Sequence, residues 1–259
     1  MMRERAREPI FNIPAVVIAL LAVLAGIHIV RAFLSPENDV GVVAIFGFTP
    51  ARLGFLIDPN AVVSRLTELA RQSDIDAQIG QFFLTYAPPS WVWFTPLSYA
   101  FLHGDNTHLI FNGVWLAAFG SPVARRFGAT RFLLLGALGA IAGALVYLAA
   151  HIAEPSPMVG ASAAISAYMG AAARFVFQPG GFYGAEEGFE PPPMASFREM
   201  FANRQTLAFL VFWFVSNLLI GLGAQRFGLS QAPVAWEAHI GGFVIGVLLA
   251  PLFDQRRKA

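Results

Sequence analysis

The sequence predicts an all-α membrane protein with six transmembrane helices and a long external loop between the first two. The 259 residues are 56% hydrophobic and 13% charged, and the mean hydropathy is +0.60. A soluble domain carries about 25% charged residues, so this chain has too few charges to cover a surface that faces water. The arrangement of its apolar runs supports the same conclusion.

Apolar runs mark the six spans, because a bilayer core about 30 Å thick requires about 20 helical residues. Three runs contain no charged residue and predict the first, third and fifth helices: residues 13–30, 132–150 and 206–224. Three shorter runs contain polar residues and predict the second, fourth and sixth helices: residues 108–123, 158–173 and 238–253. The first run follows three arginines, as a signal peptide would, but its length favours a retained span.

Basic residues predict the orientation of these helices. Twelve of the 17 Lys and Arg residues lie at one end of the predicted bundle, and such residues concentrate on the cytoplasmic side of a membrane. We therefore expect both termini in the cytoplasm, with residues 1–10 as a tail and residues 178–204 as a cytoplasmic linker. Residues 34–95 are then expected to form an external, membrane-associated loop. Within it, the pattern of residues 61–71 predicts one short helix that lies in the membrane interface.

Charge and cysteine content exclude several classes of function. The formal net charge of +1 provides no basic field for a polyanion, so nucleic acid is excluded as a partner. The chain has no Cys, which excludes disulfides, thiolate metal sites and a cysteine nucleophile. The lipid bilayer is the predicted surrounding, and any nucleophile must be an oxygen or a nitrogen.

Four polar side chains from three predicted helices share one depth in the outer half of the bilayer. Counting about 1.5 Å per residue from the cytoplasmic arginines places Ser162, Asn112, His239 and His108 at about 18, 20, 25 and 26 Å. Each alone has an ordinary explanation, as a small residue in a tight helix contact, an interhelical hydrogen bond or a buried histidine. Polar groups inside a membrane are costly and mark function, so their common depth predicts a site.

Small residues lie beneath two of these side chains. On the fourth predicted helix a stripe of serine, glycine and alanine continues the face of Ser162, and on the sixth Gly242 and Gly246 continue the face of His239. Two smooth faces can approach closely, so the imidazole can meet the hydroxyl. This predicts a dyad in which His239 takes the proton of Ser162 as the oxygen attacks a carbonyl group.

Two more polar residues predict an oxyanion hole for that reaction. His108 and Asn112 are four residues apart, so they share one helix face, and both can donate hydrogen bonds to a developing negative charge. Free backbone N–H groups at the start of the helix of Ser162 also point toward the position of this negative charge. Glu237 lies about 100° around the helix from His239 and is not expected to be a third member of the dyad.

Three motifs resemble those of the rhomboid intramembrane serine proteases. Residues 103–112 match the family pattern HxxxxHxxxN, residues 160–163 match GxSx, and residues 238–246 match AHxxGxxxG. The resemblance covers about residues 11–254 and implies a single rhomboid-like membrane domain over residues 1–259. It implies that Ser162 is the nucleophile, His239 the base, and His108 and Asn112 the oxyanion donors. The other motif residues would be structural: His103, Gly160, Gly242 and Gly246.

The resemblance also implies an activity. The expected protein is a serine endopeptidase that cuts transmembrane segments of other membrane proteins, using no metal and no cofactor. It would be a multi-pass protein of a bacterial inner membrane, with both termini in the cytoplasm.

Three departures from the family pattern leave alternatives open. Ala163 stands where the family usually has Gly, Ser166 stands where many members have a Tyr that packs on the histidine, and the Trp-Arg pair of the first loop lacks its Arg. Tyr168 lies on another face of the helix and cannot replace that Tyr. The alternatives are a rhomboid-like protein that binds transmembrane helices without cutting them and a metal site built from His103, His108 and His239.

Overall fold

The computed structural model describes residues 13–179, 181, 192–223 and 234–254. Within these residues all regular secondary structure is helical, which confirms the predicted all-α class for this part of the chain. The extended pairing found there is an isolated antiparallel bridge between Phe48 and Met158. The predicted tail, residues 1–10, and residues 182–191 of the predicted linker lie outside the described residues.

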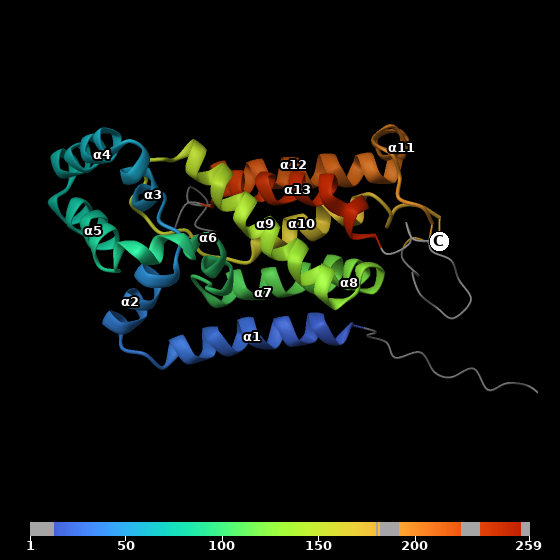
Figure 1. The fold of residues 1–259 in the computed structure, drawn as a ribbon, viewed down its shortest axis with the longest axis horizontal. Coiled ribbons are helices and arrows are strands. Elements are labelled where there is room, and N and C mark those ends of the chain that lie inside the picture. Colours follow the sequence, from blue (N-terminus) through green and yellow to red (C-terminus); the bar gives the residue numbers. More distant parts are fainter. Residues whose placement is uncertain (1–12, 180, 182–191, 224–233, 255–259) are drawn as a thin grey trace, which may run out of the picture.

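Four of the described helices are long and apolar enough to cross a membrane. They correspond to the first, third, fifth and sixth predicted spans: α1 (Ala15–Ala32), α9 (Ala129–Ala150), α12 (Arg204–Gly223) and α13 (Trp236–Phe253). In Figure 1, α1 lies along one side of the molecule, α12 and α13 lie along the opposite side, and α9 crosses between them.

The second predicted span is a continuous helical run that is longer than residues 108–123. It consists of α7 (Asn106–Trp115), the π-helical turn η3 (Leu116–Gly120) and α8 (Ser121–Phe127). The run begins where the Asp105 side chain accepts a hydrogen bond from the backbone N–H of His108. It ends at Gly128, whose φ of 77° turns the chain into α9. Its 22 residues would extend about 33 Å.

The fourth predicted span, residues 158–173, is wrong at its beginning. Helix α10 covers Ser162–Ala173, which is 12 residues or about 18 Å. Before it, Met158 pairs with Phe48, and Gly160 has a φ of +130° that an α-helix cannot contain. The pairing with Phe48 and the positive φ of Gly160 keep the chain non-helical until Ser162.

The predicted loop, residues 34–95, is mostly helical. The sequence predicts one helix at residues 61–71, and the structure contains four before residue 86, gathered at one end of the molecule in Figure 1: α2 (Pro36–Phe46), α3 (Pro50–Ile57), α4 (Pro59–Gln72) and α5 (Asp74–Thr85). Three of these helices begin with a proline at the first helical position, which favours a helix start. Ser35, Asp58 and Ser73 accept hydrogen bonds from backbone N–H groups of the first turns.

Short helical segments connect this loop to the bundle and the bundle to its last two helices. The connection to α7 consists of η1 (Pro89–Trp93), α6 (Thr95–Ser98) and η2 (Tyr99–Phe101). The predicted linker contains α11 (Phe197–Ala202), which begins with a reciprocal capping box between Ser196 and Glu199.

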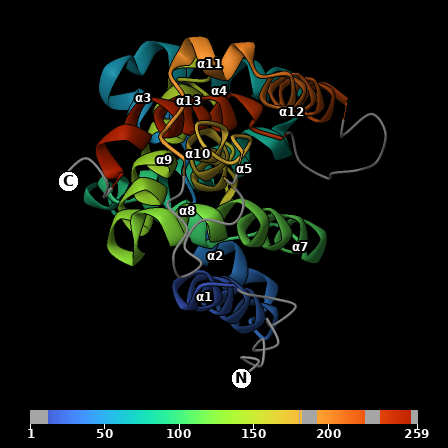
Figure 2. The same ribbon diagram turned by 90° about the vertical axis from the view of Figure 1, so that its right-hand side faces the viewer.

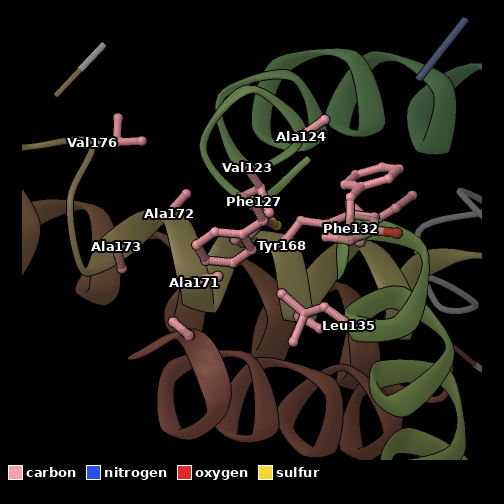
Figure 3. Close-up of a cluster of buried hydrophobic side chains, with 14 of the residues drawn as sticks. Val123, Ala124, Phe127, Phe132, Leu135, Tyr168, Ala171, Ala172, Ala173 and Val176 are labelled. Atoms are coloured by element: carbon pink, nitrogen blue, oxygen red, sulfur yellow. The ribbon is translucent and has the colours of Figure 1, made fainter. Parts of the chain in front are cut away.

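Helix α10 lies at the centre of the bundle, and its most extensive contacts are with α13 and α9 (Figure 2). Below the level of Ser162, a buried hydrophobic cluster joins α10 to α8 and α9 (Figure 3). In this cluster Tyr168 stacks on Phe132, with ring centroids 4.2 Å apart. Helix α10 is therefore packed on all sides, which fixes the position of Ser162 at its beginning.

Candidate active site

Ser162 is the first residue of α10, where the early backbone N–H groups of a helix lack intrahelical partners. The N–H of Gly160 donates to the carbonyl of Tyr99 at 3.0 Å, which holds the turn before the helix. Only glycine suits this turn, because φ is +130° and a Cβ atom there would lie 2.7 Å from Nε2 of His108. Gly160 thus brings the His108 ring beside the serine.

His239 meets Ser162 across the contact between α13 and α10. Its Nε2 atom lies 2.7 Å from Oγ of Ser162, so the structure brings together the two residues that the sequence predicts as a dyad. Both side chains are half-buried. This distance is within the range that direct proton transfer requires.

The predicted glycine face explains how the two helices come so close. A Cβ atom on Gly242 would lie 2.8 Å from the carbonyl carbon of Ala163, and one on Gly246 would lie 2.7 Å from that of Ala167. Both contacts are with backbone atoms, which cannot turn aside as a side chain can. The structure thus places both glycines at a contact that has no room for a larger residue.

His108 and Asn112 lie on α7. Asn112 is buried, and its Nδ2 donates to the carbonyl of His108 at 2.9 Å. The structure thus places the His108 ring beside Ser162, whereas the hydrogen bond of Asn112 is made within its own helix. One amide hydrogen of Asn112 is left for another acceptor.

His103 lies in the loop before α7 and is 1% exposed. Its ring packs edge-on against that of His108, with centroids 5.1 Å apart, and its two ring nitrogens have no hydrogen-bond partner among the described residues. Burial lowers the pKa of His103 to about 3, so the ring is neutral. The backbone carbonyl of His103 accepts from Arg31, which also pairs with Asp39 at 2.7 Å and so ties this loop to the end of α1.

Asn217 on α12 is a site residue that the sequence analysis missed. Its Oδ1 lies 2.7 Å from Nδ1 of His239, on the side of the ring opposite Ser162. The depth count could have found it, because Asn217 is thirteen residues above Arg204, or about 20 Å, in the same band as Ser162. Glu237 instead contacts His151 at 2.9 Å, away from the dyad, as the sequence predicts.

Ala163 and Ser166, the two residues of α10 that depart from the family pattern, have different surroundings. The Ala163 methyl faces Gly143 of α9, because a Cβ atom on Gly143 would lie 2.5 Å from that of Ala163. Gly143 therefore leaves room for the extra methyl. Ser166 is buried, and Tyr168 packs on α9 rather than on His239, as its helix position predicts.

A histidine metal site receives no support from this geometry. In the part of the chain that the structure describes, no group of three or more His, Cys, Asp or Glu side chains is placed to hold a metal ion. Both ring nitrogens of His239 contact other side chains, those of Ser162 and Asn217.

A known protein family matches most of this chain. The Rhomboid domain model matches residues 90–256, which include every residue of the site. Relatives called "Rhomboid protease GlpG" occur in Yersinia pestis (strain Pestoides F) and Yersinia pseudotuberculosis serotype O:3 (strain YPIII), each 27% identical over 172 residues, or 65% of this chain and 50% of the relative. The protein of that name from Serratia proteamaculans (strain 568) is 27% identical over 169 residues.

The chain spans about half the length of the curated relatives that it matches. The Rhomboid domain, the bacterial relatives and the four long apolar helices indicate a multi-pass integral membrane protein. Because the domain model covers well over half of the sequence and all three motifs, the chain belongs to the rhomboid family.

Proposed function

We propose that this protein is a serine endopeptidase that cleaves transmembrane segments of other membrane proteins with the dyad of Ser162 and His239. The observation that carries the proposal is the 2.7 Å contact between Oγ of Ser162 and Nε2 of His239 at the beginning of α10. The protease names of the relatives support the same reaction class.

The geometry supports a two-step reaction. His239 Nε2 accepts the proton of Ser162 as Oγ attacks the scissile carbonyl carbon, and His239 then gives this proton to the leaving amine as the C–N bond breaks. A water molecule attacks the resulting ester with His239 again as the base, which releases the acid product and restores the serine. Each step uses the same hydroxyl and the same ring nitrogen.

The oxyanion that forms in both steps would lie among three kinds of donor. The backbone N–H groups in the first turn of α10 point toward the start of the helix, where the helix dipole also favours negative charge. The His108 ring lies next to Gly160 and contributes one donor, and the free amide hydrogen of Asn112 contributes a second.

The proposed topology has six spans, with the run from α7 to α8 as the second and α10 as the fourth. Both termini are cytoplasmic, the whole chain from 1 to 259 is one membrane domain of a bacterial inner membrane, and helices α2 to α5 form the external loop. Helix α10 is short, so Ser162 lies below the membrane surface. A substrate helix must unwind locally to expose its carbonyl groups there.

A rhomboid-like protein that binds helices without cutting them is the competing function. Ser166 favours it, because the histidine lacks an aromatic neighbour at that position. Ala163 does not favour it, because its methyl group is accommodated at Gly143 and not over the N–H groups of the first turn.

Cleavage of a generic transmembrane substrate by the purified full chain in detergent tests the proposal. We expect wild type to cut it and Ser162→Ala to leave it intact. Ser166→Ala is the matched control, because this buried serine lies one turn away on the same helix and should leave the rate unchanged. Cleavage by Ser162→Ala at the wild-type rate would contradict the proposed function.

A further inference from the structure

One face of α12 meets α13 at three successive levels. The Trp213 ring stacks on Phe243, with centroids 4.2 Å apart, and four residues later Asn217 reaches His239. Four residues further, a Cβ atom on Gly221 would lie 2.8 Å from that of Trp236. These residues follow the i, i+4 spacing of one helix face. An aromatic contact and a glycine contact therefore hold Asn217 at the level of the dyad from below and above.

The burial of Asn217 is exceptional for its helix. Among the side chains of α12 that the structure describes, two are buried, those of Thr206 and Asn217, and Asn217 is 9% exposed. An amide inside an apolar helix is costly unless it has a partner. The partner of Asn217 is the ring nitrogen of His239 that does not contact the serine.

We infer that Asn217 is a positioning residue, which holds His239 in the tautomer that carries its proton on Nδ1. The inference rests on the proposed function and adds a third residue to the dyad. The Oδ1 atom of an amide can only accept a hydrogen bond, so Nδ1 must be the donor in this contact. The lone pair of Nε2 is then free for the Ser162 hydroxyl, as a general base requires.

The same contact acts during the reaction. When Nε2 takes the serine proton, the ring becomes positively charged, and the dipole of the Asn217 carbonyl points its negative end at the ring from the opposite side. The other atom of the amide, Nδ2, has no hydrogen-bond partner among the described residues. The amide therefore contributes to the site through its oxygen.

Variants of Asn217 separate this role from simple packing. Asn217→Leu keeps the size of the side chain and removes the acceptor, and we expect kcat to fall about 10- to 100-fold while KM and the melting temperature stay close to wild type. Asn217→Asp keeps an acceptor and should recover at least about ten-fold of that loss. Ser216→Ala, one residue away on another face of α12, is the control and should match wild type.

Two results would overturn the inference. Asn217→Leu with the kcat of wild type would show that the contact is not used, and Asn217→Asp as slow as Asn217→Leu would show that an acceptor is not what the site needs. Ser162→Ala in the same series separates this outcome from failure of the proposed function. If wild type cuts and Ser162→Ala does not, the function stands whatever Asn217 does.

A direct reading of the tautomer does not depend on cleavage. The chain has five histidines, so ¹⁵N-histidine NMR of the protein in detergent micelles can be assigned with His239→Ala. We expect a proton on Nδ1 of His239 in wild type, and loss of this preference in Asn217→Leu. A His239 ring protonated on Nε2 in wild type would contradict the inference even if the protein proved inactive.

Discussion

Helices α12 and α13 each bring one polar side chain to the site, but they are held in different ways. Seven residues of α13 are buried in the protein, compared with two of the described residues of α12. Helix α13 contacts the backbone of α10 through Gly242 and Gly246, whereas α12 contacts α13 mainly through side chains around Asn217.

This difference shows that the reacting pair and the residue that supports it are held by contacts of different kinds. Contacts between backbones set the spacing of the helices that carry Ser162 and His239, and that spacing cannot change unless whole helices move. The contact with Asn217 is one hydrogen bond on a helix that is otherwise exposed, so it can be lost alone. We therefore expect changes on the α13 side to have larger effects than changes on the α12 side.

The largest effect is expected for the base on the tightly packed side. His239→Ala removes the proton acceptor, so cleavage should fall about 10⁴-fold, well beyond the loss expected for Asn217→Leu. The melting temperature should change little, because the side chain is half-buried and the glycine contacts remain. Comparison of initial cleavage rates and thermal unfolding of the two variants checks this order, and equal losses would remove the distinction between the helices.

The next effect concerns the backbone contact itself. Gly242→Leu would force α13 away from Ala163, so it should strongly reduce cleavage, though by less than His239→Ala, and lower the free energy of unfolding by about 1–3 kcal/mol or more. Gly26→Leu on α1 is the matched control, because no atom lies within 4 Å of a Cβ there. Thermal unfolding and cleavage of both proteins test the comparison. An active and stable Gly242→Leu protein would show that the contact does not set the geometry.

A smaller effect is expected on α7. Removal of one oxyanion donor costs about 10²- to 10³-fold in kcat, and the N–H groups of α10 remain in either variant. His108→Ala should approach this loss, and Asn112→Ala should lose less, because its amide already donates to its own helix. Steady-state kinetics give the order, and full activity of both variants would make these side chains structural.

The smallest effect is expected for Ala163→Gly. The methyl group lies against Gly143, so its removal should change kcat by less than about three-fold. A large gain in cleavage would instead show that this methyl obstructs the oxyanion hole and would favour the protein that binds helices without cutting.

Much of the site could be predicted from the sequence, because its members carry a local signal. Ser162, His239, His108 and Asn112 are polar residues in apolar runs at one depth, and the small residues beside them mark the faces that meet. The close approach of the helix of Gly242 to the helix of Ser162 follows from the same spacing, whereas the particular contact with the backbone of Ala163 comes from the structure.

The remaining features depend on contacts that helix periodicity does not show. Helix α10 begins at Ser162 because Gly160 is held by a loop that is distant in sequence, and apolar residues 158–161 gave no sign of this. The helices of the loop begin at proline and at capping residues, and the length of an apolar run does not reveal such helix starts. Asn217 was missed because one uncharged amide within a long apolar run does not change the prediction of a transmembrane helix there.

Labelling by a fluorophosphonate probe tests the central claim most directly, because the probe reacts with a serine only where a base makes the hydroxyl nucleophilic. We expect the purified wild-type chain to be labelled at Ser162, with the site located by peptide mass spectrometry. Labelling should disappear in His239→Ala and persist in Ser166→Ala and in the presence of EDTA. No labelling of wild type, or equal labelling of His239→Ala, would contradict the assignment of Ser162 and His239 as a working dyad.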